Sequence, residues 1–384
     1  MKNGRAYDVA VIGAGVFGAW TAYLIRQTGA SVILIDQYGA GNQRASSGGE
    51  TRIIRRGYGP DEIYSRSADR SLELWRELSK QSNHRLFHRT SVLWLARDED
   101  AYSISTLATF QRMGVAFERL TRTELQTWYP QIEFGPITWA ILEEDGGVLM
   151  AQQGVRAVVK AAERNGVTYV EQSVLPPKGK GSLESLATVE GRRITAQTFV
   201  FACGSWLPKV FPDALGELIH VTRQEVFYFG VPAGDNRFSP PAMPVWIDFN
   251  DLVYAIPDIA GCGFKIAIDA HGPEFDPDTD QRVATTEGLK AVRRYLFGRV
   301  PALANAPLLE SEVCQYENTS NGDFLIDRHP TLENVWLVGG GSGHGFKHGP
   351  AVGEYVVKRI SAGGEVEPRF TLAAKGTMHL RNVY

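Results

Sequence analysis

The chain has 384 residues, of which 43% are hydrophobic and 22% charged; this composition is typical of a folded globular protein, and the length predicts two domains. The net charge of −3 excludes the broad positive field that nucleic-acid binding requires. Three scattered cysteines form no disulfide framework and favour a reducing cytoplasm, and no apolar run is long or continuous enough to predict export or membrane insertion.

The first predicted elements form a strand, a glycine turn, a helix and a second strand. Apolar runs at 9–12 and 32–35 flank a helically periodic stretch, and Gly13, Gly15 and Gly18 form GxGxxG between strand and helix. Asp36 ends the second strand, where a carboxylate can accept hydrogen bonds from ribose hydroxyls. A bare glycine turn would be structural, but this context predicts a bound dinucleotide, with nicotinamide and flavin both open at this point.

Later segments alternate between two textures. Helices are expected at 59–80 and 152–165, an extended segment at 167–174, and a strand ending in a small-residue turn at 198–206. Segments 85–146 and 219–318 carry β-branched and aromatic alternation, which predicts a second, sheet-based domain. Residues 334–360 return to a buried strand, a glycine-rich turn and a helix, so the second domain is expected to be inserted in the first.

Four separated motifs carry a family resemblance: RASSGGETRIIR, GFKIAIDAHG, VCQY and GSGHGFKHG, in that order along the chain. Together they resemble the monomeric sarcosine oxidase and N-methyltryptophan oxidase family of FAD-dependent amine oxidases, within the D-amino-acid-oxidase superfamily, over nearly the whole chain. The resemblance implies an α/β fold with a Rossmann-like FAD-binding domain of glutathione-reductase type at 1–84, 147–218 and 319–384. The inserted substrate domain, at 85–146 and 219–318, would be built on a mixed or antiparallel sheet.

The same resemblance implies FAD bonded covalently to the sulfur of Cys314. The alternative for Cys314 is a small buried residue of a strand. The residues expected to bind FAD are Gly13, Gly15, Phe17, Gly18, Asp36, Gln37, Ser46, Arg52, Val174, Ala202, Trp206, Cys314, Gly343, His344, Gly345 and Lys347.

Lys265 matches the lysine that activates oxygen in this family. A positive charge in a dry cleft would stabilise the anion that forms when O₂ takes up an electron. The apolar neighbours of Lys265 in GFKIAI favour burial, whereas the alternative is a solvated lysine at a strand end.

Arg55 and Lys347 match a pair that holds a substrate carboxylate, and an arginine fork suits that planar group. This pairing implies an amino-acid substrate, although Arg55 could instead neutralise pyrophosphate or lie at the surface. Tyr254 and Tyr316 match aromatic residues that line the amine pocket. Trp246 stands where the sarcosine enzyme carries a smaller apolar residue, so we expect a pocket of different shape, with plain core packing as the alternative.

Asp269 departs from the family pattern, because the sarcosine enzyme has a histidine there. We expect Asp269 to pair with a cationic amine or a more basic substrate, unless it merely caps a turn with His271 and Gly272. His344 and His348 are four residues apart, but the glycines around them and the lack of a third nearby ligand argue against a metal site, and none is expected.

The predicted function is FAD-dependent oxidation of the C–N bond of a small amino acid, a secondary amine of N-methyl or cyclic type, giving an imine and H₂O₂. The expected partners are this substrate and O₂, with no nucleic acid and no membrane, and the protein is expected to be a monomer. One alternative is a dehydrogenase that passes electrons to a quinone or a protein. Another is a flavin-binding subunit of a larger amine-oxidising complex.

Overall fold

One sheet is built from strands whose apolar runs are buried on both faces. The structure, a computed structural model that describes residues 6–361 and 364–377, places these strands in the order β17 (Leu325–Arg328), β18 (Val335–Gly339), β11 (Arg193–Phe201), β1 (Tyr7–Ile12), β2 (Val32–Asp36) and β9 (Thr168–Glu171). The pairs from β18 to β9 are parallel, β17 is antiparallel to β18, and β10 (Ser185–Ala187) pairs with β11. A parallel sheet needs cover on both faces.

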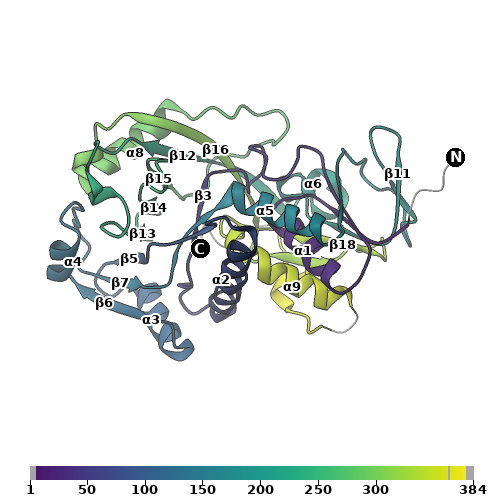
Figure 1. Ribbon diagram of the computed structural model, residues 1–384, viewed down its shortest axis with the longest axis horizontal. Coiled ribbons are helices and arrows are strands. Elements are labelled where there is room, and N and C mark those ends of the chain that lie inside the picture. The colour runs from purple at the N-terminus through teal and green to yellow at the C-terminus, as the bar shows by residue number, and fades with distance from the viewer. Residues whose placement is uncertain (1–5, 362–363, 378–384) are drawn as a thin grey trace.

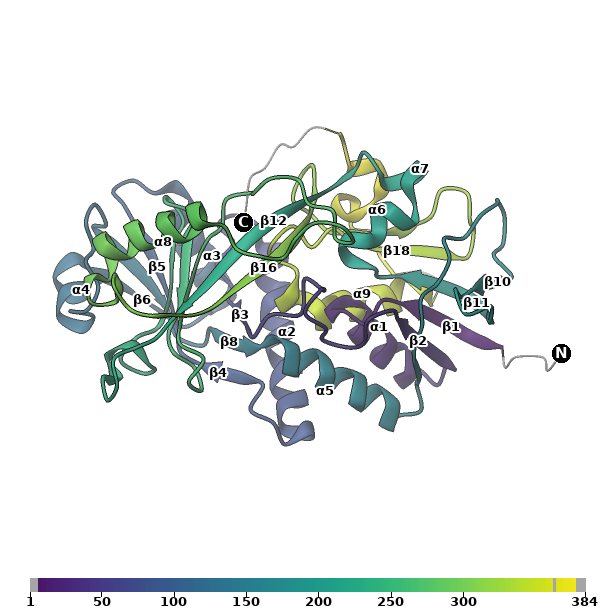
Figure 2. The same cartoon turned by 90° about the horizontal axis from the view of Figure 1, so that it is seen from above.

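Helices supply that cover. α1 (Val16–Gln27), α5 (Ala151–Arg164) and α9 (Gly349–Ile360) pack against the face that carries Val9 and Val11. The short helices α6 (Leu207–Val210) and α7 (Pro212–Leu215) cover the face that carries Ala10 and Ile12. Figure 2 shows α6 and α7 on the opposite side of this sheet from α1 and α5. The expected strand, helix and second strand are therefore β1, α1 and β2, and the expected helix at 152–165 is α5.

A second sheet contains the segments with β-branched and aromatic alternation. Its order is β16 (Leu308–Thr319), β12 (Ile219–Phe229), β15 (Phe264–Ile268), β14 (Val253–Ile256), β13 (Val245–Asp248), β5 (Val92–Ala96), β7 (Trp139–Glu143) and β6 (Phe117–Thr121). Its neighbours are antiparallel except for β13 and β5, so the sheet is mixed. α8 (Thr286–Arg299) covers one face, and α3 (Ala101–Met113) covers the other.

A third, small sheet and a long ribbon connect these two parts. β3 (Thr51–Ile54), β8 (Gly147–Met150) and β4 (Phe87–Arg89) pair antiparallel, which brings 51–54 beside the second sheet. α2 (Glu62–Ser82), the helix expected at 59–80, buries Trp75 in the first core. β12 and β16 pair from Ile219 opposite Thr319 to Phe229 opposite Leu308, with a register shift between Tyr228 and Phe229, and Figure 1 shows them running toward the middle of the molecule. Within residues 6–361 and 364–377, every helix is too short or too polar to traverse a lipid bilayer.

Candidate active site

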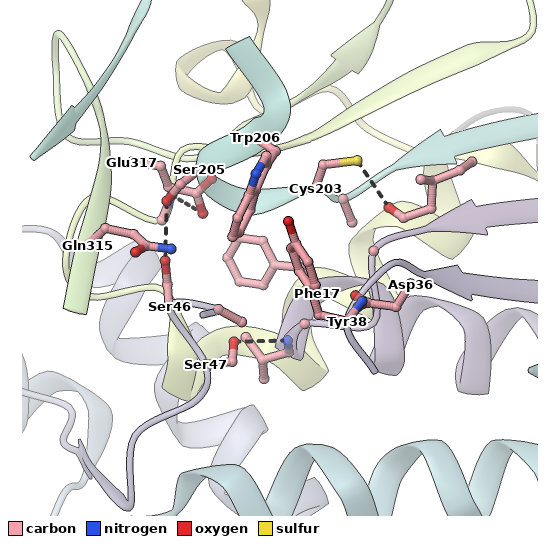
Figure 3. A pocket seen from close by; sticks show the side chains of 18 of the residues that line it. Phe17, Asp36, Tyr38, Ser46, Ser47, Cys203, Ser205, Trp206, Gln315 and Glu317 are labelled. Carbon is pink, nitrogen blue, oxygen red and sulfur yellow. Dashed lines mark hydrogen bonds between the residues drawn. The ribbon is translucent and has the colours of Figure 1, made fainter. Parts of the chain in front are cut away.

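A cavity of about 310 Å³ lies at the carboxyl ends of the first sheet's parallel strands. Its lining includes Gly13, Gly15 and Phe17 from the β1–α1 turn and Val174, Ala202 and Trp206 from later segments. Figure 3 shows Tyr38 and Trp206 around this space, with Asp36 at one end and Ser46 and Glu317 at the other. This is the edge at which open parallel sheets bind ligands.

Each of the three positions of the fingerprint requires glycine for a different structural reason. Gly13 has a φ of +100°, and a Cβ there would lie 2.3 Å from the carbonyl oxygen of Ala202. A Cβ at Gly18 would lie 1.8 Å from the oxygen of Gly13, so this glycine allows the helix to pack on the strand. At Gly15 the nearest atom is Ser47 Oγ at 3.6 Å. Gly15 therefore leaves open space at the N-terminus of α1, where backbone N–H groups favour an anion.

Asp36 is held at the far end of the large cavity by backbone donors. Its Oδ2 accepts from Ala14 N at 2.7 Å, and its Oδ1 accepts from Tyr38 N at 2.8 Å. Burial raises the pKa of Asp36, and these hydrogen bonds oppose that rise because they stabilise the ionised carboxylate. Gln37, Val174 and Trp206, which the resemblance assigns to FAD binding, line the same cavity.

A second cavity of about 90 Å³ adjoins the first. Arg52, Cys314, Tyr316, Gly343 and Phe346 line both, so the two spaces meet at these residues. Arg52 donates to Ser46 O at 2.8 Å and to Cys314 Sγ at 3.4 Å. The sulfur of Cys314 therefore lies beside a guanidinium at the boundary between the cavities.

Lys265 is buried on β15, with 1% of its surface exposed. Its Nζ donates to Thr51 O at 2.8 Å, and Arg52 donates to the same carbonyl oxygen at 2.8 Å. Burial, with the neighbouring Arg52 charge adding to it, lowers the pKa of Lys265 to about 7. The ring of Tyr228 lies 5.5 Å from Nζ. The expectation of a buried rather than solvated lysine is confirmed.

Arg55 and Lys347 meet in the second cavity. The Arg55 guanidinium lies 4.3 Å from the ring centre of Tyr58 and 4.7 Å from that of Trp94, and it donates to Gly57 O. Lys347 Nζ donates to Tyr58 OH and to His344 O, both at 2.9 Å. Burial and the nearby Arg55 charge lower the pKa of Lys347 well below its usual value. The Arg55 guanidinium and the Lys347 amino group therefore face a common space, and an anion bound there would favour the charged form of Lys347.

Asp269 faces the same cavity from the end of β15. Its Oδ1 accepts a hydrogen bond from Tyr316 OH on β16 at 2.5 Å. Burial raises the pKa of Asp269 to about 6, while this hydrogen bond and the charges of Arg55 and Lys347 act in the opposite direction. Tyr254 lines the cavity as well, and burial together with Asp269 raises the pKa of its hydroxyl. The Asp269 side chain thus reaches a different strand, β16.

A protein-family profile described as "FAD dependent oxidoreductase" matches residues 8–359. This chain belongs to the FAD-dependent oxidoreductase family. It is 31% identical to monomeric sarcosine oxidase of Bacillus sp. (strain NS-129) over 93% of each chain. It is 28% identical to N-methyl-L-tryptophan oxidase of Yersinia pestis (strain Pestoides F), over 91% of this chain and 93% of that one. The family expected from the four motifs is confirmed.

The fold of this FAD-dependent oxidoreductase is shared with a solved structure of L-proline dehydrogenase from P. horikoshii. The two superpose with a TM-score of 0.81 at 23% sequence identity, over 95% of this chain and 96% of that one. The expected α/β fold with a Rossmann-like FAD-binding part is confirmed.

The residues of the large cavity fit FAD on structural grounds. Gly15 leaves the space that a Cβ would fill at the start of α1, where a pyrophosphate is favoured. Asp36, at the other end, offers a carboxylate for a ribose. Glu317 also lines this cavity. Its carboxylate oxygen Oε2 is buried and has no hydrogen-bond partner among the residues described. A ligand with hydroxyl groups and an anionic centre satisfies all three features.

The structure corrects the expectation for Trp246. This side chain is fully buried and lies in the core beneath α8, with its ring 6.2 Å from Tyr295 and 6.5 Å from Phe264. Its neighbour Ile247 lines the second cavity instead, because successive side chains of a strand point to opposite faces. Trp246 therefore packs the core and does not shape the cavity wall.

His344 and His348 lie in a buried aromatic cluster. Tyr58 OH lies 2.7 Å from His348 Nε2 and 3.3 Å from His344 Nδ1, and His344 Nε2 lies 3.0 Å from Gly322 O. His344 also stacks on Phe324, with ring centres 5.0 Å apart. In the two stretches 6–361 and 364–377, three or more His, Cys, Asp or Glu side chains do not gather into a possible metal site.

Sequence reasoning missed several residues of the large cavity, among them Ser47 and Glu317. Ser47 Oγ accepts from Val16 N at 3.2 Å, at the mouth of α1, and its only signal was its place beside Ser46 in the first motif. Glu317 follows VCQY directly, and an acidic residue next to a cofactor motif was the available signal.

Proposed function

We propose that this protein oxidises the C–N bond of a small amino acid, a secondary amine of N-methyl or cyclic type, with O₂ as the electron acceptor. The amine loses two electrons and two protons to become an imine, and O₂ takes up both to become H₂O₂. The observation that carries this proposal is the pairing of two buried cations, Arg55 and Lys347, with the carboxylate of Asp269 in one small cavity. An amino acid carries the complementary charges. The names of the relatives, which are sarcosine and N-methyl-L-tryptophan oxidases, support the same class.

FAD, when bound, supplies the two-electron acceptor that amine oxidation needs. The chain would hold its nucleotide half with the glycine turn, Asp36 and Ser46. Its ring would lie at the boundary between the cavities, near Arg52 and Cys314, and we propose a covalent bond from Cys314 Sγ. The position of Cys314, which lines both cavities, supports this assignment.

The small cavity would position the substrate. Arg55 and Lys347 bind its carboxylate, and Asp269 pairs with its protonated nitrogen. Tyr254 and Tyr316 form apolar walls that keep water away and restrict the orientation of the C–H bond. The amine must lose its proton before oxidation, so the rate is expected to rise with pH.

Lys265 would support the reduction of O₂. Its ammonium is buried and preorganised by Thr51 O, and such a charge stabilises an anion that forms beside it. Because its pKa lies near 7, this charge is present below that pH and declines above it until a nearby negative charge restores it.

A peroxide-coupled screen of N-methyl, cyclic and primary amino acids with the purified protein tests the proposal. The best amino acid is then compared with its methyl ester in the wild type, in Lys347→Met and in the control Lys290→Met, which removes an exposed lysine of α8. We expect Lys347→Met to raise KM for the acid much more than for the ester, and the control to change neither. If an artificial electron acceptor is reduced but no peroxide forms, O₂ is not the acceptor. Turnover of the ester as fast as the acid in the wild type would rule out carboxylate recognition.

Acid precipitation of the purified protein tests the covalent link. Yellow colour should remain with the wild-type precipitate and leave with the supernatant in Cys314→Ser. Colour released from both proteins would rule out a bond through this sulfur.

A further inference from the structure

We propose that Glu317 is a positioning residue for the cofactor, whose carboxylate accepts a hydrogen bond from a hydroxyl of the FAD ribityl chain. This inference rests on the FAD family and is independent of the amine substrate. It concerns a residue outside the sequence motifs that mark the site.

Among the described residues, only one of the two carboxylate oxygens of Glu317 accepts a hydrogen bond. The residue lies on β16 one position after Tyr316, and 8% of its surface is exposed. Its Oε1 accepts from Gly341 N at 3.3 Å, whereas Oε2 is buried and has no hydrogen-bond partner within 6–361 and 364–377. A buried acceptor without a donor is destabilising, so a ligand that offers a donor to this atom would be favoured.

Glycines from two other segments keep this carboxylate uncovered. A Cβ at Gly339 would lie 3.4 Å from Oε2, and one at Gly204 would lie 3.8 Å from it. A Cβ at Gly341 would lie 3.1 Å from Oε1. Because glycine has no side chain at these positions, the Glu317 carboxylate remains next to the large cavity that the residue lines.

The position of Glu317 selects the chemical group that it can meet. Figure 3 shows Glu317 beside Ser205, on the side of the cavity away from Asp36. Ser205 Oγ is 3.4 Å from Ser46 Oγ, and the next residue, Ser47, accepts a hydrogen bond from Val16 N at the start of α1. Tyr316 lines both cavities and so lies at their boundary. Glu317 therefore lies between the expected pyrophosphate and ring positions, where FAD carries its ribityl chain.

Charge distinguishes the ribityl chain from the pyrophosphate at this point. An ionised carboxylate is an acceptor only, so it repels a phosphate and attracts a hydroxyl donor. The phosphates would instead bind at the N-terminus of α1, where backbone N–H groups favour an anion. Glu317 thus matches hydroxyl groups.

The ionisation of Glu317 supports the same role. Burial raises its pKa to about 7, and the Gly341 and Gly340 amides only partly oppose this rise. The titratable group that faces it from the end of β11 is the thiol of Cys203, whose own pKa is raised by burial and by the nearby carboxylates. A hydroxyl donor stabilises the ionised form. Binding of FAD should therefore release part of a proton near pH 7.

The test measures FAD binding to the full chain without any turnover. A Cys314→Ser background keeps the flavin removable, and calorimetric titration in two buffers of different ionisation enthalpy gives both affinity and proton release. Glu317→Gln is expected to weaken FAD by about tenfold or more and to abolish proton release. The control Glu310→Gln, an exposed glutamate on the same strand outside both cavities, should change neither.

FAD analogues that lack one ribityl hydroxyl identify the donor. In the Cys314→Ser protein one analogue should bind about tenfold more weakly than FAD, and the Glu317→Gln protein should not distinguish the two. If Glu317→Gln fails to fold, the analogue series in Cys314→Ser alone decides the question. Equal affinity of the Cys314→Ser protein for FAD and for every deoxy analogue would overturn the proposal. The same loss of analogue affinity in the proteins with and without the Glu317 carboxylate would also overturn it.

Discussion

Replacement of Asp269 by Asn removes a buried carboxylate from the small cavity. Burial raises its pKa to about 6, and Tyr316, Arg55 and Lys347 limit that rise. In the free enzyme we expect kcat/KM to fall about tenfold per pH unit below pH 6, because the protonated acid no longer pairs with a cationic amine. Asp269→Asn should abolish this acid limb and leave only the rise that the amine itself causes at higher pH.

Tyr316→Phe should move the same limb in a predictable direction. The 2.5 Å hydrogen bond from Tyr316 stabilises the ionised carboxylate. A hydrogen bond to a charged group contributes about 1.5–3 kcal/mol, which corresponds to roughly one to two pKa units. The limb should therefore move upward by that amount.

The assay is the initial rate of peroxide release at low substrate concentration across the pH range, with the best amine from the screen. Asp213→Asn, which removes an exposed carboxylate of α7, is the control and should keep the wild-type profile. An acid limb near pH 6 that survives in Asp269→Asn would refute the reasoning.

Thermal stability without substrate provides an independent readout of the same carboxylate. A folded-state pKa raised from 3.8 to about 6 means that folding penalises the ionised form. The penalty is absent below pH 3.8, grows between the two values and is complete above pH 6, where it reaches about 3 kcal/mol. Asp269→Asn should thus be more stable than the wild type at pH 8 and gain little at pH 4.

Three further predictions use other parts of the molecule. Lys265→Met should slow the reoxidation of the reduced protein in air by about a thousandfold, because one charge at roughly 4 Å contributes about 4 kcal/mol, while anaerobic reduction by the amine stays fast in stopped-flow traces; equal reoxidation rates would contradict the role of this lysine. Gly18→Ala should reduce the yield of folded protein, because the added Cβ would lie 1.8 Å from a backbone oxygen, whereas Gly15→Ala should fold but bind less flavin. Melting curves and flavin content distinguish the two variants. A normal flavin content in Gly15→Ala would contradict the prediction. Trp246→Leu should lower the free energy of unfolding by about 3 kcal/mol and leave the ranking of substrates unchanged, since this residue packs in the core; a changed ranking in the amine screen would show otherwise.

Those parts of the site that depend on local backbone chemistry could be predicted from the sequence. The spacing of Gly13, Gly15 and Gly18 and the place of Asp36 at the end of the next strand predicted a dinucleotide site, and Gly13, Gly15 and Asp36 line the large cavity. The separated motifs identified the family, because residues in several motifs and in a fixed order are far more specific than one fingerprint.

The tertiary structure alone decided which distant side chains meet. Tyr316 reaches Asp269 from another strand, and Lys265 and Arg52 share the carbonyl oxygen of Thr51. Trp246 lies in the core, although its place in the chain suggested the pocket. The physical reason is that hydrophobic periodicity indicates which side chains of an element are buried. Which residues those side chains contact depends on how the two sheets pack and which strands pair. Glu317 Oε2, which is buried and has no hydrogen-bond partner in the described part of the chain, is another such consequence, because its surroundings depend on glycines of two other segments.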